Sequence, residues 1–92
     1  MEDKNKLIVD GLIKTAFPNI KFLSYNITAY SLNTKFSFKF KNLSHFIDFL
    51  HQHQSISEEN RKLLNHLLQE SNIEPNSFFY INFFENPLEK EF

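Results

Sequence analysis

The apolar residues of the chain fall into six blocks separated by short polar stretches, and the spacing within each block predicts its structure. The first block covers residues 7–16 and has a stripe at helical spacing, made of Leu7, Ile8, Gly11, Leu12, Thr15 and Ala16. Lys6, Asp10 and Lys14 lie outside this stripe, four residues apart. We predict a helix that ends near Phe17, because the residue before Pro18 is disfavoured in helical conformation. A glycine inside it, Gly11, indicates close backbone packing at that point.

Two β-type blocks come next. Residues 20–33 are rich in β-forming residues, namely Phe22, Tyr25, Ile27, Thr28 and Tyr30. Residues 35–41 then alternate strictly, with three phenylalanines on one face and lysines and a serine on the other. Such alternation is typical of a strand that is half buried and half solvated. Because Asn33 and Thr34 can turn the chain between the two blocks, we predict that they pair as a hairpin.

Two further helical blocks follow the alternating strand. The first is predicted to begin at Asn42 or Ser44, to end near Gln54, and to carry Phe46, Ile47, Phe49 and Leu50. The second is predicted to be capped by Ser55 or Ser57, with Glu58 and Glu59 in its first turn, and to stop at Asn72. Its apolar seam consists of Leu63, Leu64, Leu67 and Leu68.

The sixth block, residues 78–84, reads Phe-Phe-Tyr-Ile-Asn-Phe-Phe and is apolar on nearly both faces. A strand of this kind belongs in the middle of a sheet or against a partner. The order of elements is therefore α-β-β-α-α-β, and the fold class is α+β: a three-stranded antiparallel sheet packed with three helices. We assign residues 1–84 to a single domain and residues 85–92 to an acidic, mobile tail.

Composition narrows the class of protein. A chain of 92 residues has room for one core, and twelve phenylalanines supply large side chains to build it. There is no cysteine, so neither a disulfide nor a thiolate metal site can form. The charged start and the interruption of the first apolar stretch by Asp10 fit neither a signal peptide nor a membrane span. We expect a cytoplasmic protein.

Charge is distributed unevenly although the net charge is only −1. Residues 11–47 contain five lysines and no acid, whereas residues 51–92 contain seven glutamates against one arginine and two lysines. The candidate binding residues are thus a basic sheet face (Lys21, Tyr25, Lys35, Lys39 and Lys41) and an acidic helical side (Glu58, Glu59 and Glu70). The alternative is a set of ordinary solvated lysines that never meet a ligand.

The residue patterns of catalysis and of cofactor binding are missing from the sequence. One glycine cannot build a glycine-rich phosphate loop, and no serine lies in a Gly-x-Ser-x-Gly elbow. His51 and His53 would point about 200° apart on a helix, and His66 has the spacing of a helical charge pair with Glu70. We expect no enzyme activity, no cofactor and no metal. Residues 44–71 form a helix–turn–helix pattern, but the acidic second helix does not suit a phosphate-lined DNA groove.

The strand from Lys35 to Lys41 is the most suggestive feature, because lysines interleaved with aromatics can neutralise phosphate while bases stack. It resembles the aromatic RNA-contacting strand of RNA recognition motifs. The strand lacks the glycine that follows the first basic residue in that pattern, and its lysines lie on the opposite face from its phenylalanines. The order of elements in the chain also differs from that of an RNA recognition motif. A buried phenylalanine row under a solvated lysine row is the interpretation we favour.

In size, composition and lack of chemistry, the chain resembles the small inhibitors encoded by phages and mobile elements, anti-CRISPR proteins in particular. This resemblance implies a non-enzymatic inhibitor of a protein or nucleoprotein target, such as a CRISPR effector nuclease or its guide-RNA complex. A module that binds RNA or single-stranded nucleic acid through the strand from Lys35 to Lys41 is the alternative. We expect no membrane partner, and a homodimer formed through residues 78–84 is compatible with both functions.

Overall fold

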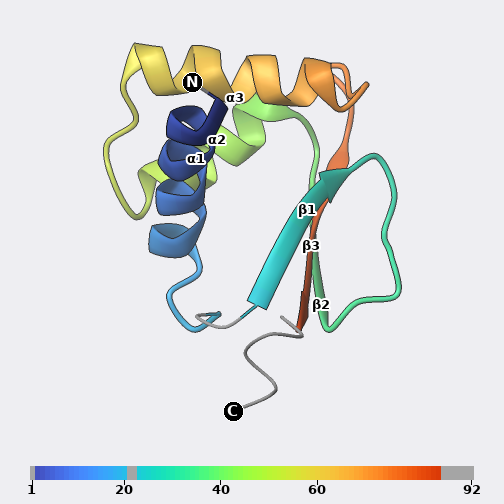
Figure 1. The fold of residues 1–92 in the computed structure, drawn as a ribbon. Helices are drawn as coiled ribbons and strands as arrows, with labels where there is room; N and C mark the ends of the chain where they lie inside the picture. Colours follow the sequence, from blue (N-terminus) through green and yellow to red (C-terminus); the bar gives the residue numbers. More distant parts are fainter. Residues whose placement is uncertain (1, 21–22, 86–92) are drawn as a thin grey trace.

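The computed structural model describes residues 2–20 and 23–85, and it confirms the predicted fold class and element order. In chain order the elements are α1 (Glu2–Ala16), β1 (Leu23–Thr28), β2 (Phe36–Phe40), α2 (Leu43–His51), α3 (Glu58–Glu70) and β3 (Phe79–Glu85). The three helices gather on one side of the sheet, with α1 upright in front and α3 across the top (Figure 1). We call the side of the sheet that faces the helices the inner face, and the opposite side the outer face.

The strand order is β1-β3-β2, so the predicted hairpin between the first two strands is wrong. Both strands pair with β3 instead, and both pairings are antiparallel. The physical reason lies in β3 itself, where Phe79, Ile81, Asn82 and Phe83 are almost completely buried. A strand buried on both faces loses its water contacts, so its backbone groups need partners along both edges.

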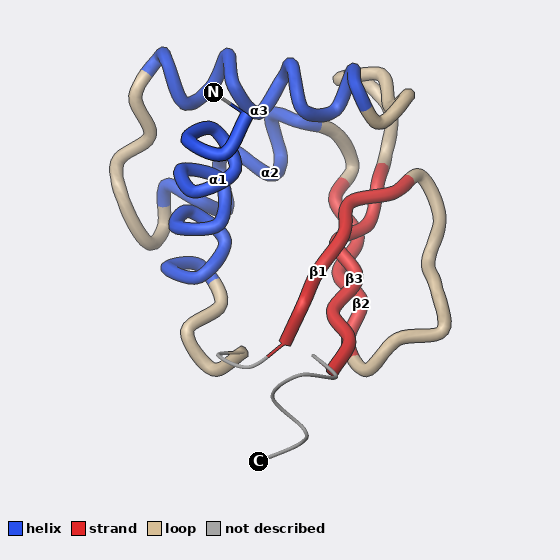
Figure 2. The backbone as a smooth tube through the Cα atoms, in the orientation of Figure 1, coloured by secondary structure: helices blue, strands red, loops and turns tan. Residues whose placement is uncertain are grey.

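Because β1 and β2 are separated by β3, the chain between them must cross the sheet. The segment 29–35 makes this crossing, as the loop that leaves the end of β1 and returns to the start of β2 (Figure 2). It runs along the outer face, since the backbone carbonyl of Tyr30 and the amide of Leu32 both bond to the side chain of Asn82.

Asn82 holds this crossing in place from the middle of β3. Its Oδ1 accepts hydrogen bonds from Ser37 Oγ (2.7 Å) and from the Leu32 amide (3.3 Å). Its Nδ2 donates to three oxygens, namely Thr28 Oγ1, Asn26 Oδ1 and the Tyr30 carbonyl, at 3.1–3.3 Å. One fully buried amide therefore joins all three strands and the crossing segment, and each of its polar groups is satisfied.

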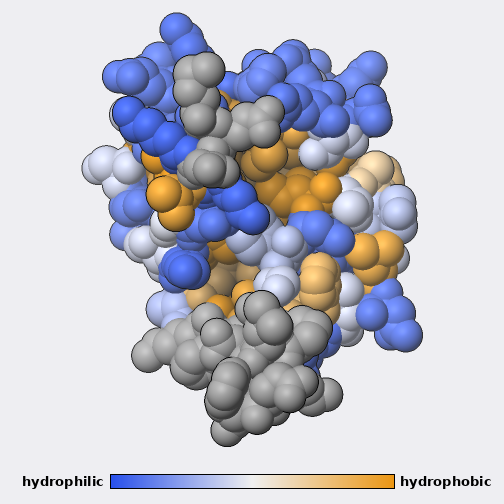
Figure 3. Space-filling model, in the orientation of Figure 1, coloured by the Kyte–Doolittle hydropathy of each residue, from blue (hydrophilic) through white to orange (hydrophobic). Residues whose placement is uncertain are grey.

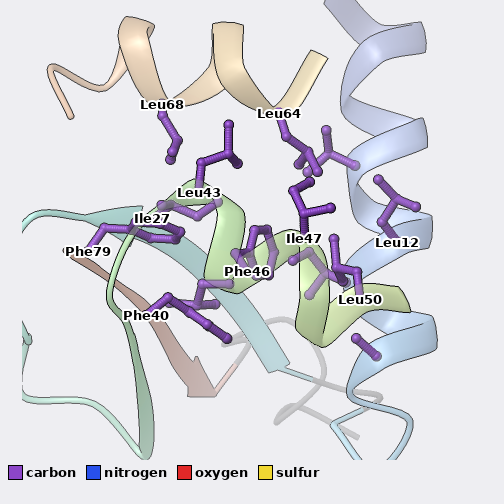
Figure 4. Packing of buried hydrophobic residues seen from close by; sticks show 14 of the residues in the cluster. Leu12, Ile27, Phe40, Leu43, Phe46, Ile47, Leu50, Leu64, Leu68 and Phe79 are labelled. Carbon is purple, nitrogen blue, oxygen red and sulfur yellow. The ribbon is translucent and has the colours of Figure 1, made fainter. Parts of the chain in front are cut away.

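The core lies between the inner face and the helices, with α2 at its centre. Phe46, Ile47 and Leu50 of α2 are buried, and they point toward the sheet and toward the other two helices (Figure 4). The ring of Phe40 on β2 lies 4.9 Å from that of Phe46 and 5.7 Å from that of Phe79. The phenylalanines thus supply the apolar volume that a short chain needs.

The buried face of α1 differs from the predicted stripe. The side chains that enter the core are Val9, Leu12, Ile13 and Ala16, whereas Leu7 is 70% exposed. A Cβ built on Gly11 would meet nothing within 4 Å, so the expected close packing is absent there. Both sets of residues have helical spacing and share Leu12 and Ala16, but the buried face has Val9 and Ile13 where the predicted stripe has Gly11 and Thr15.

The phenylalanine row of β2 is only partly buried, contrary to the prediction. Phe40 is buried, but Phe36 and Phe38 remain 45% and 37% exposed. All three occupy the inner face, because their partners in β3 are Phe83, Ile81 and Phe79. The two exposed rings lie toward the start of an edge strand, where the helices cover the sheet less completely.

The helix ends follow the predicted capping chemistry. The Asn42 side chain accepts a hydrogen bond from the His45 amide, and the Ser57 side chain accepts one from the Asn60 amide. After α3, Asn72 has a φ of 61°, a left-handed conformation that asparagine tolerates at the end of a helix. The predicted tail falls outside the described residues apart from Glu85, which ends β3. None of the described helices is long and apolar enough to cross a membrane.

Replacing Asn82 tests the role assigned to its amide. Asn82→Leu keeps the volume but leaves the Ser37 hydroxyl, the Leu32 amide and the Tyr30 carbonyl without their partner. We expect the free energy of unfolding to fall by about 2–4 kcal/mol, measured by urea denaturation. The same change at exposed Asn33, in the crossing segment, is the control and should alter stability by less than about 0.5 kcal/mol. Equal stabilities for the two variants would contradict this role.

Candidate functional site

A large open groove separates helix α1 from strand β1, with α3 at one end, and its volume is about 1030 Å³. It exists because α1 packs mainly on the other helices and reaches the sheet chiefly at its C-terminal end. There the ring of Phe17 lies 5.0 Å from that of Phe83 and 4.8 Å from that of Phe38. Apolar side chains are visible in the middle of this face of the molecule, surrounded by polar surface (Figure 3).

Helix α1 forms one wall of the groove, and strand β1 forms the wall opposite. On α1 the lining residues are Asn5, Lys6, Val9, Asp10, Ile13 and Lys14, which form one continuous helical face that Phe17 extends just past the helix end. On β1 they are the five consecutive residues 23–27, so the groove follows the edge of this strand and not only one of its faces. Apolar side chains between these walls include Leu63 and Leu67 of α3 and Phe83 of β3.

One hydrogen bond bridges the two walls. The hydroxyl of Tyr25, at the middle of β1, donates to Asp10 Oδ1 of α1 over 2.6 Å. Burial, together with the adjacent Asp10 carboxylate, raises the pKa of Tyr25 far above its ordinary value. Tyr25 therefore stays a neutral donor in the folded protein at any physiological pH, and it ties α1 to the edge of the sheet.

The rim of the groove carries both signs of charge. Lys6 and Lys14 lie one helical turn to either side of Asp10, are exposed, and form no ion pair with any residue that the structure describes. On the α3 side, Glu70 faces His66 at 3.2 Å, and both side chains are well exposed. Such a surface pair contributes little to stability. A hydrogen bond from a neutral hydroxyl does not cancel the charge of a carboxylate, so the charged α1 residues that line the groove are two lysines and one aspartate.

The predicted basic sheet face does not form one surface. Tyr25 pairs with Phe83 across the sheet and lies on the inner face, whereas Lys39 pairs with Tyr80 on the outer face. Lys35 Nζ lies 3.4 Å from Glu85 Oε1, and Lys41 just follows β2. Lys21 lies outside the described residues. Of the five residues, the structure places Tyr25 alone in the groove.

The predicted acidic side is also divided. Glu58 and Glu59 occupy the first turn of α3, and Glu70 ends the same helix, about 18 Å away at 1.5 Å per residue. Arg61 and Lys62 lie between them in sequence. Only Glu70 lines the groove.

A second cluster on the outer face could not be seen in the alternation of β2 alone. Lys39 Nζ lies 4.7 Å from the centroid of the Phe78 ring and 6.0 Å from that of Tyr80. Phe78 is 49% exposed, so the lysine and an accessible aromatic ring share one surface. The two aromatics come from β3 and the residue before it, and only the β2–β3 register brings them to Lys39.

The sequence does not mark the α1 residues as a groove, because charges at the i,i+4 spacing of Lys6, Asp10 and Lys14 are also typical of a solvated helix face. The signal that it does carry is their position beside the apolar Val9 and Ile13, which line the same groove. Within the described residues, no three histidine or acidic side chains come close enough to hold a metal ion. Comparisons with protein-family models, with curated proteins and with solved structures give no significant match to this chain.

The bridge between the walls predicts a pH-dependent stability. Because the pKa of Tyr25 is raised on folding, its contribution is complete below the ordinary tyrosine pKa of about 10 and is lost as pH rises above it. Tyr25→Phe should lower the free energy of unfolding by about 1–2 kcal/mol near neutral pH. This deficit should shrink between about pH 9 and 11, because only the wild-type protein loses the contribution there.

Urea denaturation at a series of pH values measures both effects, with Tyr30→Phe as the matched control at an exposed tyrosine. The control should follow the wild-type curve. Parallel curves for wild type and Tyr25→Phe across the alkaline range would show that the bridge does not contribute in this way.

Proposed function

We propose that the protein is a non-enzymatic binding protein that inhibits a protein or nucleoprotein target, and that the groove between α1 and β1 is its binding surface. The observation that carries this proposal is the combination, in one open groove, of apolar lining residues, a strand edge without a neighbour in the described sheet, and lysines that form no ion pair with the described residues. Protein interfaces typically have such an apolar centre within a polar or charged rim. The resemblance of the sequence to anti-CRISPR proteins makes a CRISPR effector nuclease, alone or with its guide RNA, the first target to assay.

The groove is tested by reversing charges on its rim. Lys6→Glu/Lys14→Glu changes two exposed side chains that line it, and Lys4→Glu/Lys62→Glu makes the same change in net charge at exposed lysines that do not. We expect the first variant to bind a target recovered with the wild-type protein at least about tenfold more weakly, and the second to bind normally. Binding and inhibition of the target's activity are measured with purified components, and circular dichroism checks that both variants fold.

Equal binding by both variants would show that the groove is not the docking surface. Failure of the wild-type protein to form a complex with any protein or nucleoprotein would overturn the inhibitor function as a whole.

A second candidate function, binding of RNA or single-stranded nucleic acid, is favoured by the outer-face cluster of Lys39, Phe78 and Tyr80. An exposed aromatic ring beside a lysine can stack a base while the ammonium group meets a phosphate. This candidate is weaker because Lys35 is paired with Glu85, which leaves Lys39 and Lys41 as the nearby cations on β2 and its flank.

A salt titration separates the two candidates. Binding to a fluorescent single-stranded RNA should weaken steeply with ionic strength, and Lys39→Glu should reduce both the affinity and the salt slope. Phe78→Ala should reduce affinity without changing the slope, because it removes stacking and not charge. If the wild-type protein has no measurable affinity for this RNA at low salt, the nucleic-acid function is wrong and the groove remains the binding surface to test.

A further inference from the structure

The unpaired edge of β1 indicates what kind of partner the groove accepts. In the described sheet β1 has β3 on one side and no strand on the other, and the groove runs along this open edge from Leu23 to Ile27. An edge strand presents a row of backbone N–H and C=O groups that another extended segment can satisfy. We propose, as a deepening of the proposed function, that the groove binds an extended peptide segment of its target, which adds to β1 as a fourth strand.

The opposite wall favours a single strand over a second sheet. Six residues of α1 and Phe17, which follows it, line the groove opposite β1, and the Tyr25–Asp10 hydrogen bond connects the two walls at mid-length. An added strand would lie about 4.8 Å from β1, next to the α1 wall of the groove. Because this wall covers the helix side of the groove, an isolated extended segment fits the arrangement better than a folded domain.

The lining residues define the side chains that such a peptide should carry. Alternate side chains of an added strand would point to the inner side, where Phe17, Leu67 and Phe83 offer apolar contacts. Near the rim they would meet Lys6 and Lys14, which have no described ion-pair partner. Asp10 and Glu70 also line the groove, and their contacts with the neutral Tyr25 hydroxyl and with exposed His66 do not cancel a carboxylate charge. Charge complementarity therefore favours a peptide that carries acidic residues opposite Lys6 and Lys14 and apolar residues opposite the apolar lining.

Selection from a phage-displayed library of short random peptides tests this specificity. Full-length wild-type protein is the bait, and Lys6→Glu/Lys14→Glu is used for counter-selection. We expect the recovered peptides to combine apolar residues with acidic ones. A synthetic copy of one of them should bind the rim variant at least about tenfold more weakly than the wild type or Lys4→Glu/Lys62→Glu, and this difference should shrink at high salt. No enrichment, or enrichment of peptides without acidic residues, would overturn the proposed specificity.

Backbone methylation of the selected peptide tests strand addition itself. Only every second amide of an added strand bonds to its neighbour, so N-methylation at residues of one parity should abolish binding. Methylation at the other parity should leave most of the affinity. Equal losses of affinity for methylation at both parities would show that the peptide binds without adding to β1. The proposed function would still stand if binding of the target continued to require the groove.

The same protein variants and the selected peptide also test two other occupants of the groove. Concentration-dependent dimerisation in analytical ultracentrifugation, lost in Lys6→Glu/Lys14→Glu, would assign the edge of β1 to a second copy of the chain. Displacement of the selected peptide by a synthetic peptide of residues 86–92 would assign it to the chain's own C-terminal residues. Either result would overturn the proposal of a partner peptide.

Discussion

The burial of β3 on both faces and along both edges is the constraint on which the rest of the structure depends. Phe79, Ile81 and Phe83 fill the inner side, and Asn82 is buried on the outer side. Because a strand so enclosed must bond to a neighbour on each edge, the two earlier strands cannot pair with each other. The chain must then cross β3 to connect them, and a crossing over an apolar outer face would leave its own backbone groups unsatisfied. Asn82 satisfies these backbone groups, because its side chain accepts a hydrogen bond from the Leu32 amide and donates one to the Tyr30 carbonyl.

The same arrangement leaves one edge of β1, beside α1, without a neighbour in the sheet that the structure describes. Helix α2 occupies the middle of the core and α3 lies across its upper side, so α1 takes the remaining space and reaches the sheet mainly through Phe17. The groove is thus a consequence of how three helices cover three strands. Its walls are nevertheless held at a fixed spacing, because the Tyr25–Asp10 hydrogen bond connects them.

Sequence periodicity was sufficient to predict every helix and strand. The caps Asn42 and Ser57 were each one of two candidates, and the last strand was expected in the middle of the sheet or against a partner. Periodicity could not predict the pairing of strands, because alternation tells which residues share a face but not which strand lies beside them. The hairpin failed for this reason, and so did the single basic face, since Tyr25 and Lys39 turned out to lie on opposite sides of the sheet. The clustering of Lys39 with Phe78 and Tyr80 likewise depends on register, a long-range property of the fold.

The bridging hydrogen bond also bears on how the groove could discriminate among ligands. A carboxylate can accept about four hydrogen bonds, and Tyr25 supplies one to Asp10. Since Asp10 lies midway along the α1 wall, its remaining acceptor capacity faces the middle of any segment that enters the groove. A hydrogen-bond donor of the ligand at this position would increase the affinity, whereas an acidic side chain at the same position would be repelled by Asp10. The preference for acidic residues near Lys6 and Lys14 therefore ends at the centre of the groove, and this change of sign along one wall would give a bound strand a defined register.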